Sequence, residues 1–310
     1  MRVLFIKDTF DKILVYECSP VTIGIPAIIA KYRFNAPIFF WVQDLWPESI
    51  TAAGGIKNKH VINLVDKLTR FIYWHSKNIL VESRAFIPYI LNQRVASNKI
   101  IYLPNSTENF YVKINPSDKY KKIMPKDGPI LMFAGNIGEA QGFDVIIKSA
   151  KYLHDSEVKV NWVILGDGRQ RQSLEQKINE LGLHNNFFFL GSYPSEEMPY
   201  FFAYADAMLV TLKKRFIFSL TIPTKIPSYM ACSKPILASM DGEGARIILE
   251  AKCGYASPSE DHVSFTNSIT RFLKLNTKEK NLMGSNARLY FETEFDREKQ
   301  IDSIINIFNN

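Results

Sequence analysis

The sequence predicts an α/β protein made of two Rossmann-like domains that face a cleft. The chain has 310 residues, of which 46% are hydrophobic, enough for two ordinary domains with cores of their own. Strand-like apolar runs alternate with segments of helix length, which is typical of a parallel sheet built from βαβ units. A polar stretch at residues 106–127, with three lysines between 119 and 122, interrupts this alternation and divides the chain into two series.

The first series contains four apolar runs that we interpret as strands. They are KILVYECS (12–19), APIFFWVQD (36–44), NILVES (78–83) and IIYLPN (100–105). The second run is hydrophobic at nearly every position, as expected when both faces of a parallel sheet are covered. Helices are predicted over residues 24–34, 61–76 and 84–93.

The second series repeats this alternation. Its predicted strands are PILMFAG (129–135), VNWVILG (160–166), FFFLG (187–191), ADAMLVTL (205–212) and KPILAS (234–239). Helices are predicted over residues 143–153 and 169–182, after Ser195, over residues 226–232 and from Glu243, followed by a helical tail over 278–310. The predicted organisation is a first domain at 1–110, a linker at 111–127, a second domain at 128–290 and a C-terminal helix at 291–310.

Composition restricts the partners and the compartment. The net charge of +7 suits an anionic partner or simply a soluble surface. Nucleic acid is a less favoured partner, because the Lys and Arg residues are scattered and form no recognisable nucleic-acid-binding module. The three cysteines, Cys18, Cys232 and Cys253, lack metal-ligand spacing, which favours reduced core thiols. No apolar run approaches the roughly 20 residues of a membrane span, and MRVLFIKD lacks the features of a signal peptide. We therefore expect a cytoplasmic protein.

The polar clusters of the second series follow its strands, where open α/β sheets bind their ligands. Gly135, Gly138 and Gly142 form a loop that opens a helix, which suits a phosphate group but equally an ordinary glycine-rich turn. Their spacing is not that of the dinucleotide-binding fingerprint. Lys225 begins a predicted helix, where a cation opposes the helix dipole unless an anion lies nearby.

Three further strand ends carry candidate binding residues. GDGRQR supplies Asp167 and Arg169, although a plain turn with solvated arginines is the simpler reading of that loop alone. GSYP offers either its backbone or the side chain of Tyr193 as a contact for a nucleobase. Glu243 begins a helix, where an acidic residue is good capping chemistry, and contact with a sugar hydroxyl is the functional alternative.

The first series has one such cluster, in FWVQDLWPESI (40–50). Gln43, Asp44, Trp46 and Glu48 crowd together where the strand must stop, and Pro47 ends it because proline has no N–H to donate. We expect this loop to form one wall of the cleft.

In this order the motifs resemble those of retaining glycosyltransferases of family four, which have the GT-B fold. The glycine loop, GDG, GSYP, the Lys225 helix with KPILA, and GEGAR resemble the half that binds the nucleotide sugar. SPVTIGIPA, FWVQDLWPES, ILVES and LPN resemble the acceptor-side half of bacterial members that build surface polysaccharides, similar to fucosamine transferases.

The chain departs from the family pattern at two places. Leu220 and Ser228 stand where the family carries two glutamates, and Asn136 and Gln141 stand where it carries an arginine and a lysine. The family's first domain also begins some tens of residues before KILVYECS. The resemblance therefore implies an incomplete N-terminal domain, with a partner chain as a source of the missing strands.

The resemblance implies retaining transfer of a sugar from a nucleotide-diphosphate sugar, with UDP as the nucleotide, to a lipid-linked or glycan acceptor, without a metal ion. Asp44 and Lys225 would be the catalytic residues, and Gln43, Trp46 and Glu48 would lie on the acceptor side. The donor would be bound by Gly135, Asn136, Gly138, Gln141, Asp167, Arg169, Tyr193, Lys225, Ser228 and Glu243. The alternatives are a GT-B nucleotide-sugar epimerase and a non-catalytic remnant that only binds nucleotide sugar. Residues 67–77, KLTRFIYWHSK, suit contact with an anionic membrane or a helix packed on the sheet.

Overall fold

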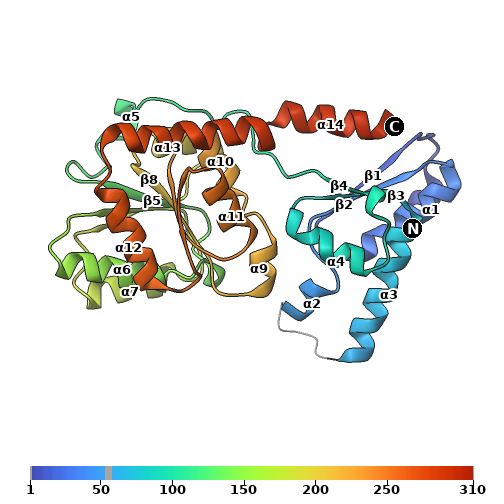
Figure 1. The fold of residues 1–310 in the computed structure, drawn as a ribbon, viewed down its shortest axis with the longest axis horizontal. Helices are drawn as coiled ribbons and strands as arrows, with labels where there is room; N and C mark the ends of the chain where they lie inside the picture. The colour runs from blue at the N-terminus through green and yellow to red at the C-terminus, as the bar shows by residue number, and fades with distance from the viewer. Residues whose placement is uncertain (1, 53–57, 310) are drawn as a thin grey trace. The chain divides into compact units, whose positions relative to one another are not determined.

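The computed structural model describes residues 2–52 and 58–309. The chain forms two compact units, which are described separately (Figure 1). Unit 1 consists of residues 1–105, 215–222 and 300–310, and unit 2 of residues 106–214 and 223–299.

Unit 1 contains a four-stranded parallel sheet in the order β1-β2-β3-β4. Its strands are β1 (Ile13–Glu17), β2 (Ile38–Val42), β3 (Ser76–Val81) and β4 (Ile100–Tyr102). All four predicted strands of the first series are thereby confirmed. The order advances in one direction, so right-handed crossovers place α1 (Gly24–Phe34), α3 (Lys59–His75) and α4 (Ile87–Asn92) on the same face. Phe40 and Ile79, which pair in the sheet, and Tyr73 of α3 are fully buried in the core of this face.

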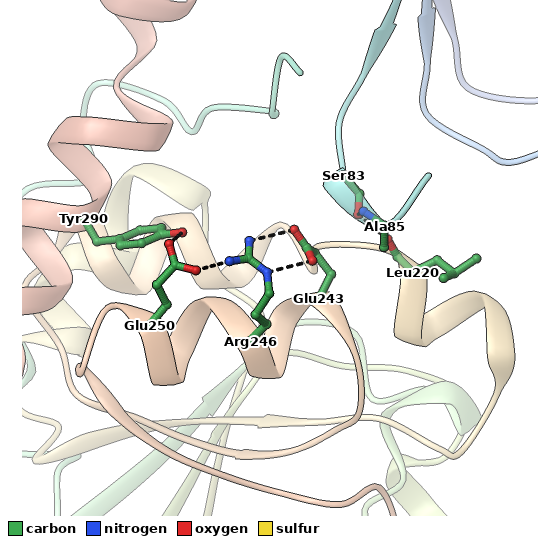
Figure 2. A network of polar contacts seen from close by, with 7 residues as sticks. All are labelled: Ser83, Ala85, Leu220, Glu243, Arg246, Glu250 and Tyr290. Carbon is green, nitrogen blue, oxygen red and sulfur yellow. Dashed lines mark hydrogen bonds and ion pairs between the residues drawn. The ribbon is translucent and has the colours of Figure 1, made fainter. Parts of the chain in front are cut away.

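Two segments that are distant in sequence complete unit 1. Phe308 of α14 (Arg297–Asn309) lies against Phe39 of β2, with ring centroids 4.7 Å apart. Phe216 of α9 (Phe216–Leu220) lies edge-on to Tyr89, and the Ser83 hydroxyl donates to the Leu220 carbonyl (Figure 2). The sequence placed residues 215–222 in the second domain. The structure assigns them to unit 1, because long-range packing, and not chain order, fixes the place of this short helix.

Unit 2 contains a six-stranded parallel sheet in the order β10-β9-β8-β5-β6-β7. Its strands are β5 (Ile130–Ala134), β6 (Asn161–Leu165), β7 (Phe187–Gly191), β8 (Ala207–Thr211), β9 (Ile236–Ser239) and β10 (Gly254–Ser257). This is the doubly wound order of a Rossmann-like domain, in which the direction of winding reverses between β5 and β8. Ligands of such sheets bind beyond the carboxyl ends of the strands near this reversal.

Helices cover both faces of this sheet (Figure 1). One face carries α6 (Asp144–Asp155), α7 (Arg171–Glu180) and α12 (His262–Leu273), which enclose the buried Trp162. The other carries α10 (Lys225–Ala231) and α11 (Glu243–Glu250), and α13 (Thr277–Tyr290) packs on α10. The remaining helical turns are short: Arg2–Phe5, Val21–Ile23, α2 (Glu48–Ala52), Arg84–Phe86, Ser97–Lys99, α5 (Asp118–Lys121), Glu139–Gln141, Ser195–Glu197, α8 (Met198–Phe202) and the π-helical turn Phe291–Phe295.

Two features of unit 2 differ from the sequence-based expectation. Strand β10 was not predicted, because GYAS is short and weakly apolar; Gly254 is required there, since a Cβ would lie 1.8 Å from the Ile236 carbonyl oxygen. The segment 111–127, expected to be a linker, packs on unit 2. Tyr120 is buried, stacks on Phe201 at 4.0 Å and donates its hydroxyl to Glu197. The sequence did not predict this packing, because a single buried aromatic residue in a polar stretch produces no hydrophobic periodicity.

Within residues 2–52 and 58–309, no helix combines the length and the apolar character needed to cross a membrane.

Candidate functional site

The loops after β5 and β6 of unit 2 interlock through glycines. Gly135 has φ +136°, and a Cβ on it would lie 3.3 Å from the Lys225 Nζ atom. Gly166 has φ +124°, and its Cβ would lie 2.0 Å from the Gly135 carbonyl oxygen. The Ile137 N–H donates to the Asp167 carbonyl at 2.8 Å, which fixes one loop on the other. Side chains at these glycines would separate the loops, so the chain needs glycine here.

The loop after β5 borders a cavity of 640 Å³ at the carboxyl ends of the strands. Its volume lies within the roughly 300–1,000 Å³ of small-molecule sites. Six residues predicted to bind the donor line it: Gly135, Asn136, Gln141, Tyr193, Lys225 and Ser228. Four other predicted donor residues do not line it: Gly138, Asp167, Arg169 and Glu243.

Lys225 is the main cation of this cavity. Its Nζ donates to the Gln141 side-chain oxygen at 2.9 Å and lies 3.9 Å from the centroid of the Phe133 ring. No carboxylate of the described residues forms an ion pair with it. Burial lowers the pKa of Lys225 to about 7. Glu108 also lines the cavity, but a partly buried ammonium group without an ion-pair partner among the described residues is well suited to bind an oxyanion.

Hydroxyl groups line the same cavity. The Thr107 and Ser228 hydroxyls lie 2.8 Å apart, and Ser228 occupies one of the positions where the resembling family has glutamate. Tyr111 also lines the cavity, and burial raises its pKa to about 12. Sequence reasoning missed Thr107 and Tyr111, because they lie in or beside the segment interpreted as a linker.

Glu243 is held by an arginine. It is 5% exposed, and both of its carboxylate oxygens accept from Arg246, at 2.9 and 3.0 Å (Figure 2). Arg246 also pairs with Glu250, which accepts from the Tyr290 hydroxyl at 3.3 Å. Its contact with a donor sugar stays a prediction.

Of the residues after β6, Asp167 accepts from the Gly168 N–H at 2.7 Å and from Arg171 at 3.3 Å. Arg169 is exposed. The structure thus places both residues on the β6 loop, next to the glycine turn but outside the lining of the cavity.

Unit 1 has a polar cluster at the carboxyl ends of its four strands. Glu17, at the end of β1, is fully buried and accepts from the backbone N–H groups of Ser19 at 3.2 Å and Asp44 at 3.3 Å. Burial, together with the charge of Asp44, raises the pKa of Glu17 to about 7. Glu17 therefore holds together the two loops that carry Ser19 and Asp44.

A second buried carboxyl group fixes Gln43. The Asn105 side-chain amide donates to both Glu82 and Gln43, at 2.6 Å in each case. Burial raises the pKa of Glu82 to about 8. Sequence reasoning missed Glu17, Glu82 and Asn105. Each lies at or within two residues of the end of a predicted strand, as Asp44 does, and the carboxyl ends of parallel strands meet at one edge.

Asp44 and Trp46 line a cavity of 590 Å³ in unit 1. Ile217 and Phe218 form part of its apolar wall. The Trp46 indole N–H and the Ser49 hydroxyl are buried and have no hydrogen-bond partner among the described residues. Gln43 and Glu48, also predicted on the acceptor side, lie next to this cavity in sequence but do not line it. Burial raises the pKa of Glu48, which begins α2.

Comparisons with known proteins give a consistent picture. The family model for "Glycosyl transferases group 1" matches residues 115–290. The probable glycosyltransferase WbjE of Pseudomonas aeruginosa is 27% identical over 80% of this chain and 62% of WbjE. WcaI of Escherichia coli K12, a putative colanic acid biosynthesis glycosyl transferase, is 28% identical over 58% of this chain and 44% of WcaI. The chain thus matches less than two thirds of the length of either relative.

Solved structures confirm the GT-B fold. HepE of Anabaena, in complex with UDP, has a TM-score of 0.78 at 17% identity and covers 96% of this chain and 78% of its own. The lipopolysaccharide outer core galactosyltransferase WaaB has a TM-score of 0.68 at 14% identity and covers 98% of this chain and 76% of its own. The matched segment includes every predicted donor residue. The chain belongs to the family of glycosyl transferases group 1.

Proposed function

We propose that this protein transfers a sugar from a nucleotide-diphosphate sugar, with UDP as the nucleotide, to a lipid-linked or glycan acceptor in surface polysaccharide biosynthesis. One observation carries the proposal: Lys225, without a carboxylate partner among the described residues, lies beside the Gly135 turn in a cavity of ligand size. The description of WcaI as a colanic acid enzyme and of HepE as a protein solved with UDP-glucose supports the same class.

In the proposed mechanism the second unit stabilises the leaving diphosphate. Lys225 supplies positive charge where the diphosphate separates from the sugar, and the loop around Asn136 and Gln141 supplies amide groups. Thr107 and Ser228 would bind ribose or sugar hydroxyls and Tyr193 would contact the base; all three line the cavity. The other predicted donor residues are proposed to contact the donor from outside the lining of the cavity: Gly138, Asp167, Arg169 and Glu243.

The acceptor is proposed to bind in the cavity of unit 1. Trp46 offers an aromatic face to a saccharide, and Asp44 a carboxylate that orients a hydroxyl. Gln43 and Glu48 are proposed to support this loop. The proposal also includes retention at the anomeric carbon and transfer of a hexose without a metal ion. It includes membership of family four, in its fucosamine-transferase-like branch. A cytoplasmic location at the inner face of the membrane is also part of it.

Further strands are proposed to pair beside β1. It is an edge of the described sheet, and its Leu14 and Tyr16 are 41% and 48% exposed. An added strand would cover this edge. Slow amide hydrogen exchange along β1 would support the pairing, and fast exchange there would contradict it.

A nucleotide-sugar panel tests the function. UDP and the productive UDP-sugar should raise the melting temperature of the wild type, and Lys225→Met should need a higher ligand concentration for the same rise. The matched control is Lys177→Met, which removes a lysine paired with Asp144 outside the cavity. With membranes added, the wild type should release UDP from one UDP-sugar, with or without EDTA. Binding without turnover would point to the non-catalytic alternative, and binding of no nucleotide sugar would refute the proposal.

A further inference from the structure

A second cavity of unit 1 is cationic. It has a volume of 440 Å³ and lies between the C-terminal half of α3 and the segment that joins α4 to β4. Arg70, Arg94 and Lys99 line it, together with Tyr73, Trp74 and Gln93. It shares no lining residue with the cavity at Asp44, and none of the described residues that line it is acidic.

The charge around this cavity favours an anion. Residues 59–99 contain seven Lys and Arg but only two Asp and Glu, and one of these acids, Asp66, pairs with Arg70 at 2.9 Å. Lys99 is anchored to the Ser76 carbonyl at 2.9 Å, and burial, followed by the charge of Lys31, lowers its pKa. Arg94 has φ +63°, a conformation in which glycine or asparagine would cost less.

Two buried polar atoms of the cavity residues lack a partner. Gln93 is 6% exposed; its amide nitrogen donates to the Trp46 carbonyl at 2.8 Å, but its side-chain oxygen accepts from no described residue. The Nε atom of Arg70 is likewise buried and without a partner among the described residues. Such atoms are costly to leave unsatisfied. Both atoms lie below the surface of the cavity, so the class of ligand is inferred from the cationic side chains that line it.

An exposed apolar stripe adjoins the cavity along α3. Leu64, Phe71 and Trp74 are 67%, 50% and 73% exposed, and their spacing places them on the same face, with Lys67 between them. The stripe extends for about 15 Å. Trp74 belongs both to the stripe and to the lining of the cavity. The opposite face of α3 buries Thr69, Ile72 and Tyr73. Exposed aromatic side chains beside basic ones are typical of helices that lie on a membrane surface.

We propose that this cavity binds the phosphate-containing headgroup of an anionic glycerophospholipid while Leu64, Phe71 and Trp74 insert into the lipid surface. The arginines and Lys99 meet the phosphate. Because Gln93 also binds the Trp46 carbonyl, the occupied cavity would support the loop that carries Asp44 and Trp46. The proposal goes beyond sugar transfer and does not depend on it.

Flotation of the full chain with vesicles tests the proposal. The wild type should bind phosphatidylcholine vesicles that contain phosphatidylglycerol and should bind pure phosphatidylcholine at least tenfold more weakly. Arg94→Gln with Lys99→Gln should weaken binding to the anionic vesicles about tenfold or more, because each basic residue near an anionic surface contributes to binding. Phe71→Ser with Trp74→Ser should weaken it similarly, and these exposed side chains can be replaced without loss of the fold.

Two controls keep the test decisive. Lys148→Gln with Tyr152→Ser, which changes an exposed basic and aromatic pair on α6 of unit 2, should leave vesicle binding unchanged. Urea unfolding, measured on the same samples, should show that each variant keeps the folded structure of both units. Equal binding to neutral and anionic vesicles, or wild-type binding by the cavity variant, would overturn the proposal. Vesicle-independent binding of glycerol 3-phosphate that Arg94→Gln abolishes would replace the lipid with a soluble phosphate ligand.

Discussion

Replacing Lys225 with methionine should weaken UDP binding by about 10- to 100-fold. A hydrogen bond between a charged pair contributes about 1.5–3 kcal/mol, and about 1.4 kcal/mol corresponds to a tenfold change in affinity. The fold should survive, because methionine keeps the unbranched shape and the contact with Phe133. Burial disfavours the charged lysine, so the melting temperature without ligand should stay the same or rise.

The same residue makes binding depend on pH. The pKa of Lys225 is about 7 in the free protein, and a bound phosphate stabilises the ammonium form and raises it. Affinity should therefore be greatest below pH 7 and fall by up to about tenfold per pH unit above it. The diphosphate contributes no slope there, because its last ionisation lies near pH 6. Lys225→Arg should bind with little pH dependence, since arginine stays charged.

Isothermal titration calorimetry at pH 7, 8 and 9 measures the effect. At pH 8, titrations in two buffers with different ionisation enthalpies should show proton uptake on binding by the wild type and none by Lys225→Arg. Equal wild-type dissociation constants at pH 7 and pH 9, or equal affinity of the wild type and Lys225→Met, would refute this account of Lys225.

Three further predictions concern the glycine turn, the buried carboxyl groups and the C-terminal helix. Gly135→Ala should abolish UDP-induced stabilisation in thermal melts, because φ +136° and the contact with Lys225 exclude a Cβ. The control is Gly182→Ala, at φ +71° with open space around it. It should lower the free energy of unfolding by about 1 kcal/mol and leave UDP binding, measured by calorimetry, intact. Glu17 and Glu82 have pKa values of about 7 and 8 against an ordinary 4.5, so the folded state binds more protons between these values, and the free energy of unfolding should fall as pH rises from 5 to 9. For Glu17 the free energy of unfolding should fall by up to about 3 kcal/mol, at about 1.4 kcal/mol per pKa unit. Urea unfolding at pH 5 and pH 9 should show a smaller fall for Glu82→Gln than for the wild type. An equal fall in both proteins would contradict this reasoning. Phe308→Ala should destabilise unit 1 by about 1–3 kcal/mol through loss of its contact with Phe39, whereas Ile305→Ala, which truncates a half-exposed side chain of the same helix, should change the urea midpoint little.

The strands could be predicted where burial imposes a continuous apolar run. ILMFA of β5 and IFFWV of β2 are of this kind, because a parallel sheet covered on both faces leaves no polar alternation. Strand β10 escaped because GYAS carries little apolar signal and is held by its pairing with β9. The place of Tyr120 was likewise decided by a distant partner, Phe201.

Candidate site residues could be predicted where one residue type conflicts with its local position. Asp44 stands out at a strand end and Lys225 at a helix start, and each lines a cavity of its own unit. Glu17 and Glu82 end strands in the same way, but their importance depends on partners far along the chain. Glu17 accepts from Asp44, and Glu82 accepts from Asn105, which also binds Gln43.

The sequence by itself determined the α/β class, the parallel strands, the glycine turn and the identity of Lys225 as an anion-binding candidate. Each of these depends on local chemistry: apolar runs, backbone conformations open only to glycine, and a cation at a helix start. Only the tertiary structure decided which polar side chains lose contact with water. Burial moves the pKa values of Glu17, Glu82 and Lys225 towards neutrality, and burial depends on residues that the sequence keeps far apart.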